Sequence, residues 1–155
     1  MIYFSSINDL SSNGKFDKNV LSANKPVWGI TELSSPTFKR IKKGDFILFY
    51  YSGKIFCFSE VLKTEVNSDL SLELFGSFNH PLKGEVKWSN ILWLKNITLI
   101  DIDFAFFKNI CGYSHKYSIR RIISLNKKGQ EYINRNYNSE LEFVMELKSG
   151  SRQFI

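Results

Sequence analysis

Cysteine is scarce in this 155-residue sequence, and its placement excludes the usual cysteine-based sites. Cys57 and Cys111 are far apart, and neither lies in a CxxC motif or beside a pair of histidines. The sequence therefore predicts no zinc site. Both cysteines have apolar neighbours, which indicates two reduced core thiols in a cytosolic protein.

Histidine is equally scarce, which leaves few candidates for a general base. A Ser-His-Asp or Cys-His arrangement needs a histidine, and the chain has two. His80 precedes Pro81 in an expected loop, and His115 lies in the polar run 112–118, so both are expected at the surface. The sequence also has no GxxxxGK[ST] phosphate loop, so the chain alone is not expected to hydrolyse nucleoside triphosphates. We expect a protein that is not an enzyme and uses no cofactor.

Three charged positions keep one enzymatic alternative open. Asp69 followed by Glu85-Val86-Lys87 matches the acid…acid-x-Lys spacing of magnesium-dependent nucleases, in which carboxylate oxygens hold the metal. Glu85 follows Lys83-Gly84 in an expected turn, however, and so short a pattern arises easily by chance.

Long apolar runs are absent as well. No stretch reaches the length of a membrane span, and the N-terminus has no basic region followed by an apolar one. Neither a membrane anchor nor export is expected, and a cytoplasmic location is the prediction.

Positive charge and aromatic side chains are abundant. The 21 Lys and Arg against 15 Asp and Glu give a formal net charge of +6. A basic balance favours a polyanionic partner, because each cation placed on a phosphate releases counterions. Aromatic residues make up 15% of the chain, more than a core of this size needs, so some rings are expected to serve a surface or pocket. Nucleic acid is the partner that these features favour.

The patterning predicts one α+β domain with a curved, mostly antiparallel sheet or small barrel and about three short flanking helices. Strands are expected at 2–4, 27–30, 46–51, 54–66, 91–94, 97–100 and 119–125. Helices are expected at 17–23, 35–41 and 104–110 and from 127 through 133. The stretch 67–87 is expected to be a long loop that holds a short strand around 72–75.

Local signals set the ends of these helices. Asp17, Asp103 and Asn126 are expected N-cap residues, and Ser35 caps a helix that has Pro36 at its first position. In residues 138–155, apolar residues recur at intervals among polar ones, which predicts a terminal helix or a linker. The domain proper is therefore expected to span residues 1–137.

Aromatic and basic residues occur together at several positions. Trp28 lies near Lys25 and beside Gly29, where a ligand could approach the backbone closely. Phe75 and Phe78 lie in the expected long loop, where a core role is unusual. For Trp28 a pocket wall and a core position both stay open.

Core packing is the favoured role for Trp88 and Trp93. Arg120 and Arg121 are adjacent on an expected strand, where they must point to opposite sides.

Several segments resemble the YTH domain and its relatives in the PUA-like superfamily, which includes the EVE domains. Tyr3-Phe4, Asn19-Val20 and Val27-Trp28 are similar to the YTH opening, where a strand leads through a helix to a Val-Trp pair. The segments 46–49 and 52–56 are similar to its apolar strand, Ser-Gly turn and return strand.

Two later segments complete the resemblance, which covers the chain to about Ile133. Ile91-Leu92-Trp93-Leu94 stands where the family has a Trp-bearing strand. Lys128-Gly129-Gln130-Glu131 resembles the Asp-Gly-Gln-Glu that opens its last helix, with Lys in place of Asp.

The resemblance implies that a methylated adenine is flipped into an aromatic cage. Trp28 would form one wall, and the carbonyl of Gly29 would accept a hydrogen bond from the methylamino N–H. Phe75 or Phe78 would supply the second wall, where the family has Trp, and Trp93 is a further pocket candidate.

The expected phosphate and backbone contacts are basic. The resemblance assigns this role to Lys127 or Lys128, and Lys25, Arg120 and Arg121 are the further candidates.

The implied function is to read N6-methyladenine in DNA as the specificity domain of a modification-dependent restriction system. Related domains of McrB-type proteins precede a GTPase motor that works with a nuclease partner. The alternatives are an RNA-binding PUA-like domain that prefers single strands, the metal-dependent nuclease, and a protein-interaction domain whose charge is incidental.

Overall fold

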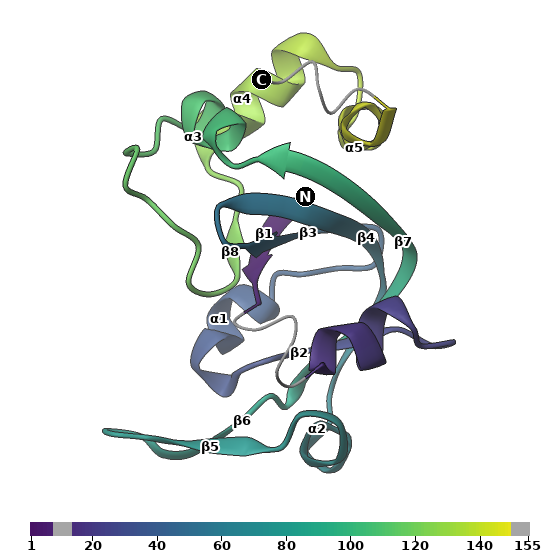
Figure 1. The fold of residues 1–155 in the computed structure, drawn as a ribbon, viewed down its shortest axis with the longest axis vertical. Coiled ribbons are helices and arrows are strands. Elements are labelled where there is room, and N and C mark those ends of the chain that lie inside the picture. Colours follow the sequence, from purple (N-terminus) through teal and green to yellow (C-terminus); the bar gives the residue numbers. More distant parts are fainter. Residues whose placement is uncertain (8–13, 150–155) are drawn as a thin grey trace. The chain divides into compact units, whose positions relative to one another are not determined.

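The structure, a computed structural model, describes residues 1–7 and 14–149. Figure 1 shows its elements along the chain. The strands are β1 (Ile2–Ser6), β2 (Val27–Ile30), β3 (Phe46–Tyr51), β4 (Lys54–Val66), β5 (Ser77–His80), β6 (Gly84–Lys87), β7 (Asn90–Asp103) and β8 (Ile123–Ser124). The helices are η1 (Asp17–Leu21), η2 (Glu32–Ser34), α1 (Ser35–Phe38), α2 (Ser68–Phe75), α3 (Ala105–Cys111), α4 (Lys127–Asn136) and α5 (Glu140–Ser149).

The chain forms two compact units. Unit 1 contains residues 1–8, 46–59 and 98–155, and unit 2 contains residues 9–45 and 60–97. The strands β4 and β7 contribute residues to both units, and each unit has its own apolar cluster.

Six strands pair in the order β2-β7-β4-β3-β1-β8, and β5 pairs with β6 in a separate hairpin. The β1–β3 pair is parallel, whereas β1–β8, β2–β7 and β5–β6 are antiparallel. The two-residue turn at Ser52-Gly53 joins β3 to its neighbour β4. The predicted α+β class with a curved, mostly antiparallel sheet is confirmed.

Phenylalanine rings build the core of unit 1. Phe4 meets Phe104 and Phe107 edge to face, with ring centroids 5.5 and 5.1 Å apart. Phe143 of α5 meets Phe107 in the same way at 6.3 Å, so α5 is part of this core. The terminal segment predicted as a helix or a linker is thus helical from Glu140 to Ser149, and residues 150–155 lie outside the described part.

Several predicted elements match the structure. The bounds of β2, β3 and β4 agree with the predictions, and residues 46–49 of β3 are all buried, as expected for a central strand. Asn126 caps α4 as predicted, because its side chain accepts from the Gly129 N–H. The two strands expected at 91–94 and 97–100 are one strand, β7, in which Asn96 has a positive φ of 55°.

The stretch 67–87 is not a long loop with a strand at 72–75. Residues 68–75 form α2, because the Asn67 side chain accepts from the Leu70 N–H and so caps the helix. Gly76 ends α2, and β5 and β6 follow as a hairpin. The prediction missed Asn67 as a cap and took a short apolar helical face for a strand.

Three other predicted elements are shorter than expected. The helix expected at 35–41 ends at Phe38, and Ser34 rather than Ser35 is its N-cap. The helix η1 covers 17–21, and Asp17 is in its first turn rather than at the cap. The strand expected at 119–125 is reduced to the two residues of β8, because only 123 and 124 pair with β1.

The described helices are also short. None of those within residues 1–7 and 14–149 is long and apolar enough to cross a membrane.

Candidate nucleic-acid interface

The positive charge of the chain is concentrated in one stretch, residues 104–130, called the basic segment below. It contains six Lys and Arg residues and no Asp or Glu. The chain has 21 basic and 15 acidic residues in all, so the rest of the chain has fifteen of each. The formal net charge of +6 therefore originates entirely in the basic segment. Its cations are Lys108, Lys116, Arg120, Arg121, Lys127 and Lys128.

The basic segment lies in unit 1 and runs from α3 through a loop and β8 into α4. Gly112 ends α3 in the left-handed conformation with a φ of 70°. The Asn126 amide donates to the Cys111 carbonyl at 2.8 Å, and its oxygen accepts from the Gly129 N–H at 2.8 Å. One side chain therefore fastens the start of α4 to the end of α3.

The loop between α3 and β8 borders an open groove of about 540 Å³. Its lining residues are Lys116, Tyr117, Ser118, Arg120, Arg121 and Ile123. The three cations are exposed, and none has an ion-pair partner among residues 1–7 and 14–149. The groove is therefore positively charged without internal compensation.

Arg120 and Arg121 do not lie on a strand, contrary to the prediction. They precede β8 in irregular backbone, and both line the groove. In a strand, successive side chains point to opposite faces of the sheet. Irregular backbone does not impose this, so the two adjacent arginines can line the same groove.

Two tyrosines stack at this groove. Tyr113 and Tyr117 have ring centroids 4.3 Å apart and planes 25° from parallel. Burial raises the pKa of the Tyr113 phenol above its ordinary value, and the neighbouring Cys111 and Tyr117 add to this shift. Tyr113 also stacks on the buried Phe104, so it is the inner ring of the pair, and Tyr117 lines the groove.

Lys127 and Lys128 occupy the first turn of α4, and both are exposed. A cation at a helix N-terminus interacts unfavourably with the helix dipole, so these two lysines do not serve the local helix. The Lys128 side chain extends over Gly112 at the end of α3.

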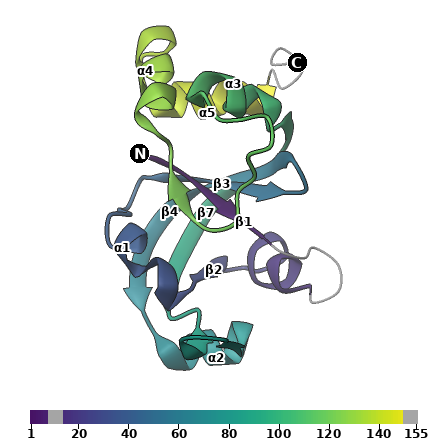
Figure 2. The same cartoon turned by 90° about the vertical axis from the view of Figure 1, so that its left-hand side faces the viewer.

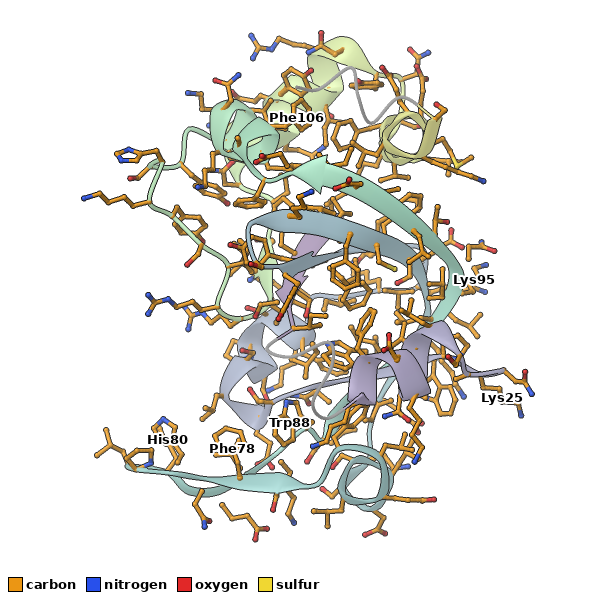
Figure 3. All side chains as sticks on the ribbon, in the orientation of Figure 1. Lys25, Phe78, His80, Trp88, Lys95 and Phe106 are labelled. Atoms are coloured by element: carbon orange, nitrogen blue, oxygen red, sulfur yellow. The ribbon has the colours of Figure 1, made fainter. Side chains whose placement is uncertain are left out.

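A second set of candidates lies in unit 2 and is called the aromatic cluster: Phe16, Trp28, Phe75, Phe78 and Trp88. Trp28 meets Phe16 and Phe75 edge to face, with centroids 5.1 and 5.6 Å apart. Phe78 packs on Trp88 at 5.1 Å, and Figure 3 shows these two rings side by side. The structure brings Trp28 and Phe75 together as the resemblance implies.

The space beside Gly29 is filled by protein. A methyl group at Gly29 would lie 2.7 Å from the Trp88 Cβ and 2.9 Å from the Phe75 ring. Phe75 is 3% exposed and Phe16 is 1% exposed, so both rings that contact Trp28 are buried. The aromatic cluster is therefore packed by its own side chains at this position.

The backbone of Gly29 points to the edge of β2 that pairs with no strand of the described sheet. Gly29 lies opposite Ile91 in the antiparallel β2–β7 pair. The Leu94 N–H donates to the Pro26 carbonyl at 2.9 Å, so these two residues form a hydrogen-bonded pair. Hydrogen-bonded and non-hydrogen-bonded pairs alternate along an antiparallel ladder. The next hydrogen-bonded pair therefore contains Trp28, and the Gly29–Ile91 pair is a non-hydrogen-bonded one. The Gly29 carbonyl thus faces away from β7, toward the edge of the described sheet.

Lys15 ties parts of the aromatic cluster together. Its ammonium donates to the Phe75 carbonyl at 2.7 Å and lies 5.6 Å from the centroid of the Trp88 ring. The Asn19 amide donates to the Leu74 carbonyl at 3.3 Å, which also fastens the end of α2.

Trp93 packs against the apolar cluster of unit 2 that contains Phe75, whereas Lys25 is exposed. The Trp93 indole donates to Glu65 at 2.6 Å, and the Lys63 ammonium lies 5.0 Å from the ring centroid. Trp93 packs against the apolar residues of unit 2 and is opposite Val27. Lys25 is exposed before β2, and its side chain projects outward (Figure 3).

The residues considered for catalysis have structural roles or lie on the surface. The His80 Nδ1 accepts from the Leu82 and Lys83 N–H groups at 3.1 and 3.2 Å, which holds the β5–β6 turn. His115 is exposed. Within the described residues, no group of three His, Cys, Asp or Glu side chains could hold a metal ion.

Within residues 1–7 and 14–149, Asp69 and Glu85 belong to no group of side chains that could hold a metal ion. The Glu85 carboxylate lies 3.8 Å from the Lys87 ammonium, and Asp69 is exposed on α2.

Solved structures resemble this chain, whereas no family model and no curated protein matches it. A variant of the ASCH protein from Zymomonas mobilis has a TM-score of 0.52 at 14% identity and covers 86% of this chain and 94% of its own. A Pseudomonas putida protein has a TM-score of 0.53 at 14% identity and covers 87% of this chain and 98% of its own. A Pseudomonas syringae protein has a TM-score of 0.50 at 13% identity, with coverage of 87% and 98%. The fold is PUA-like.

The fold agrees with the one that the resemblance seen in the sequence implies. The identities are low, so the likeness concerns the fold alone. The narrower resemblance to YTH and EVE domains stays a prediction.

The sequence reasoning missed part of the groove. It singled out Arg120, Arg121, Lys127 and Lys128, but not Lys116 or the Tyr113–Tyr117 pair. A running tally of charge would have found the acid-free stretch 104–130.

Proposed function

We propose that this chain is a non-catalytic nucleic-acid-binding module, and that its basic segment contacts the phosphate backbone. The observation that supports the proposal is the segment itself, which holds the whole net charge of +6. Arginine and lysine on phosphates release condensed counterions, and this release supplies most of the sequence-independent affinity for nucleic acids.

The groove residues fit this role physically. Arg120 and Arg121 are exposed and have no carboxylate partner in the described part of the chain, so a phosphate need not compete with an internal ion pair. A guanidinium also matches a phosphate with two parallel donors.

Binding to labelled single-stranded oligonucleotides, followed by fluorescence anisotropy, tests the proposal. Arg120→Gln/Arg121→Gln should raise Kd by roughly tenfold or more near 0.1 M salt, because two phosphate contacts are lost. The control Lys42→Gln/Lys43→Gln removes the same charge from two exposed residues outside the basic segment. Equal weakening in both variants contradicts the proposed contact surface. No binding at low salt favours a protein-interaction domain instead.

The same oligonucleotides test the absence of catalysis. Incubation with magnesium should leave the strands intact. Cleavage that is lost in Asp69→Asn or Glu85→Gln would establish the nuclease alternative.

We further propose that Trp28 is one wall of a slot for a flipped, N6-methylated adenine. The Gly29 carbonyl supports this proposal, because it faces away from β7, at the edge of β2 that pairs with no strand of the described sheet. Phe75 occupies the space over Gly29, so the ring must move when a base enters. A base stacked on an aromatic ring gains roughly 1–3 kcal/mol, and a buried methyl group adds about 0.8 kcal/mol.

Matched oligonucleotides with and without N6-methyladenine test this slot. Methylation should tighten binding, and Trp28→Ala should remove that gain. Trp93→Ala should keep the gain, because the Trp93 indole is bound to Glu65. If methylation has no effect on the wild type, the slot proposal fails while the basic-segment proposal stands.

The identity of the polymer and the biological setting follow from the resemblance. We propose DNA over RNA, a modification-dependent restriction system with a fused GTPase motor and nuclease partner, and a cytoplasmic location. Tighter binding to methylated DNA than to methylated RNA of the same sequence is the expected result. The reverse order would favour an RNA-binding PUA-like domain.

A further inference from the structure

We propose that the groove of unit 1 takes an unpaired base of a single-stranded nucleic acid, stacked on Tyr117. This inference rests on the proposed nucleic-acid binding by the basic segment and deepens it. It names the ligand class as single-stranded, and it names Tyr117 as the residue that contacts the base.

A ladder of aromatic rings leads from the core of unit 1 into the groove. Phe104 is fully buried, and Tyr113 stacks on it with centroids 6.5 Å apart and planes 20° from parallel. Tyr117 stacks on Tyr113 at 4.3 Å. Phe4 meets Phe104 edge to face at 5.5 Å, which anchors the inner end of the ladder.

The outer end of the ladder is accessible. Tyr117 is half-buried and lines the groove, and Tyr113 covers one face of its ring. A base can extend the ladder on the other face. Stacking on a single aromatic ring contributes roughly 5- to 150-fold in affinity per base and tolerates any base, because each has a π-face.

The loop that carries Tyr117 has a defined conformation. The Tyr117 N–H donates to the Ser114 carbonyl at 2.9 Å, and the Lys116 N–H donates to the Ser114 hydroxyl at 3.3 Å. The Lys108 ammonium donates to the His115 carbonyl at 2.6 Å, which ties the loop to α3. Figure 2 shows this green stretch running from α3 to β8. The ring is thus held in place by a hydrogen-bonded turn.

Cations flank the ring on both sides in sequence. Lys116 precedes Tyr117, Arg120 and Arg121 follow it, and all four residues line the groove. An aromatic platform among cations suits a single strand, in which phosphates alternate with unstacked bases. In a duplex the base faces are occupied by neighbouring pairs, and exposing one requires extrusion. We therefore expect a preference for single strands.

Anisotropy titrations with oligothymidine, oligouridine, a duplex and an abasic strand, each of about twelve nucleotides, test the inference. The wild type should bind both base-bearing single strands at least 5-fold more tightly than the abasic strand or the duplex. The comparison of oligothymidine with oligouridine identifies DNA or RNA as the preferred source.

Two variants change the stacking residue: Tyr117→Leu removes the aromatic ring, and Tyr117→Phe keeps it. The control is Tyr51→Leu, because Tyr51 is a half-buried tyrosine of β3 that does not line the groove. Tyr117→Leu should lose the advantage of base-bearing strands over the abasic strand, whereas the other two variants keep it. Thermal melts verify that each variant is folded.

Two outcomes overturn the inference in different ways. If the wild type binds abasic and base-bearing strands equally, or Tyr117→Leu keeps the difference, the basic segment binds phosphates without base stacking. Only the present inference then fails. If no strand binds at low salt, the proposed function fails together with it.

Discussion

Replacing Gly29 by alanine tests the packing of the aromatic cluster. The new Cβ would lie 2.7 Å from the Trp88 Cβ and 2.9 and 3.0 Å from two atoms of the Phe75 ring. Favourable carbon–carbon contacts lie near 3.5–4.0 Å, so the neighbours must move by about 1 Å. The Trp88 Cβ is bonded directly to the backbone and cannot swing away as a side-chain tip could.

The expected cost follows from these contacts. Inserting a methyl group into a packed core destabilises by about 1–3 kcal/mol, and alanine regains about 0.5–1 kcal/mol over glycine in a strand. We expect Gly29→Ala to lower the free energy of unfolding by roughly 1–2 kcal/mol, which for a chain of this length is a fall in Tm of roughly 3–6 °C.

Urea unfolding followed by tryptophan fluorescence measures this change, because all three tryptophans lie in unit 2. Gly29→Ala should lower the free energy of unfolding by less in a Phe75→Leu background than in the wild type. The reason is that the Phe75 ring makes two of the three close contacts. A Gly29→Ala protein as stable as the wild type would refute the close packing.

Three further predictions concern unit 1. Asn126→Ala removes the bonds to Gly129 and Cys111 and should lower the free energy of unfolding by about 1–2 kcal/mol in urea titrations followed by far-UV circular dichroism; no change would mean that the cap is dispensable. Burial raises the pKa of Cys111 to about 11 and that of Cys57 to about 12 from an ordinary 9.0. The contribution of the two buried thiols to the free energy of unfolding is complete below pH 9.0 and is lost as the pH rises toward these pKa values. The free energy of unfolding should therefore fall less steeply over this pH range in Cys111→Ala than in the wild type. Native protein should also react slowly with iodoacetamide at neutral pH, and rapid labelling would contradict the burial.

Strong local patterns predicted much of the fold. The apolar run 46–49 and the Ser-Gly turn fixed the central hairpin, and Asn126 marked the start of α4. These features depend on neighbours in sequence, so the sequence shows them directly. The stretch 119–125 misled the prediction, because its apolar residues 119, 122 and 125 are buried in a loop that packs on the core.

The candidate site was predictable in composition but not in geometry. The adjacent arginines and the lysines before Gly129 stood out by charge. The stacking of Tyr117 on Tyr113 depends on the turn at Ser114, whose hydrogen bonds cannot be read from residue order. The packing of Phe75 over Gly29 likewise depends on α2, and this stretch was predicted to be a loop with a short strand.

The salt dependence of single-strand binding tests the central claim most directly. Each phosphate contact adds about 0.7 to the magnitude of the slope of log Kd against log salt concentration for single strands. Arg120→Gln/Arg121→Gln should reduce this slope by about 1.4, whereas Lys42→Gln/Lys43→Gln should leave it unchanged. If both pairs change the slope equally, or neither does, nucleic acid does not bind through the basic segment.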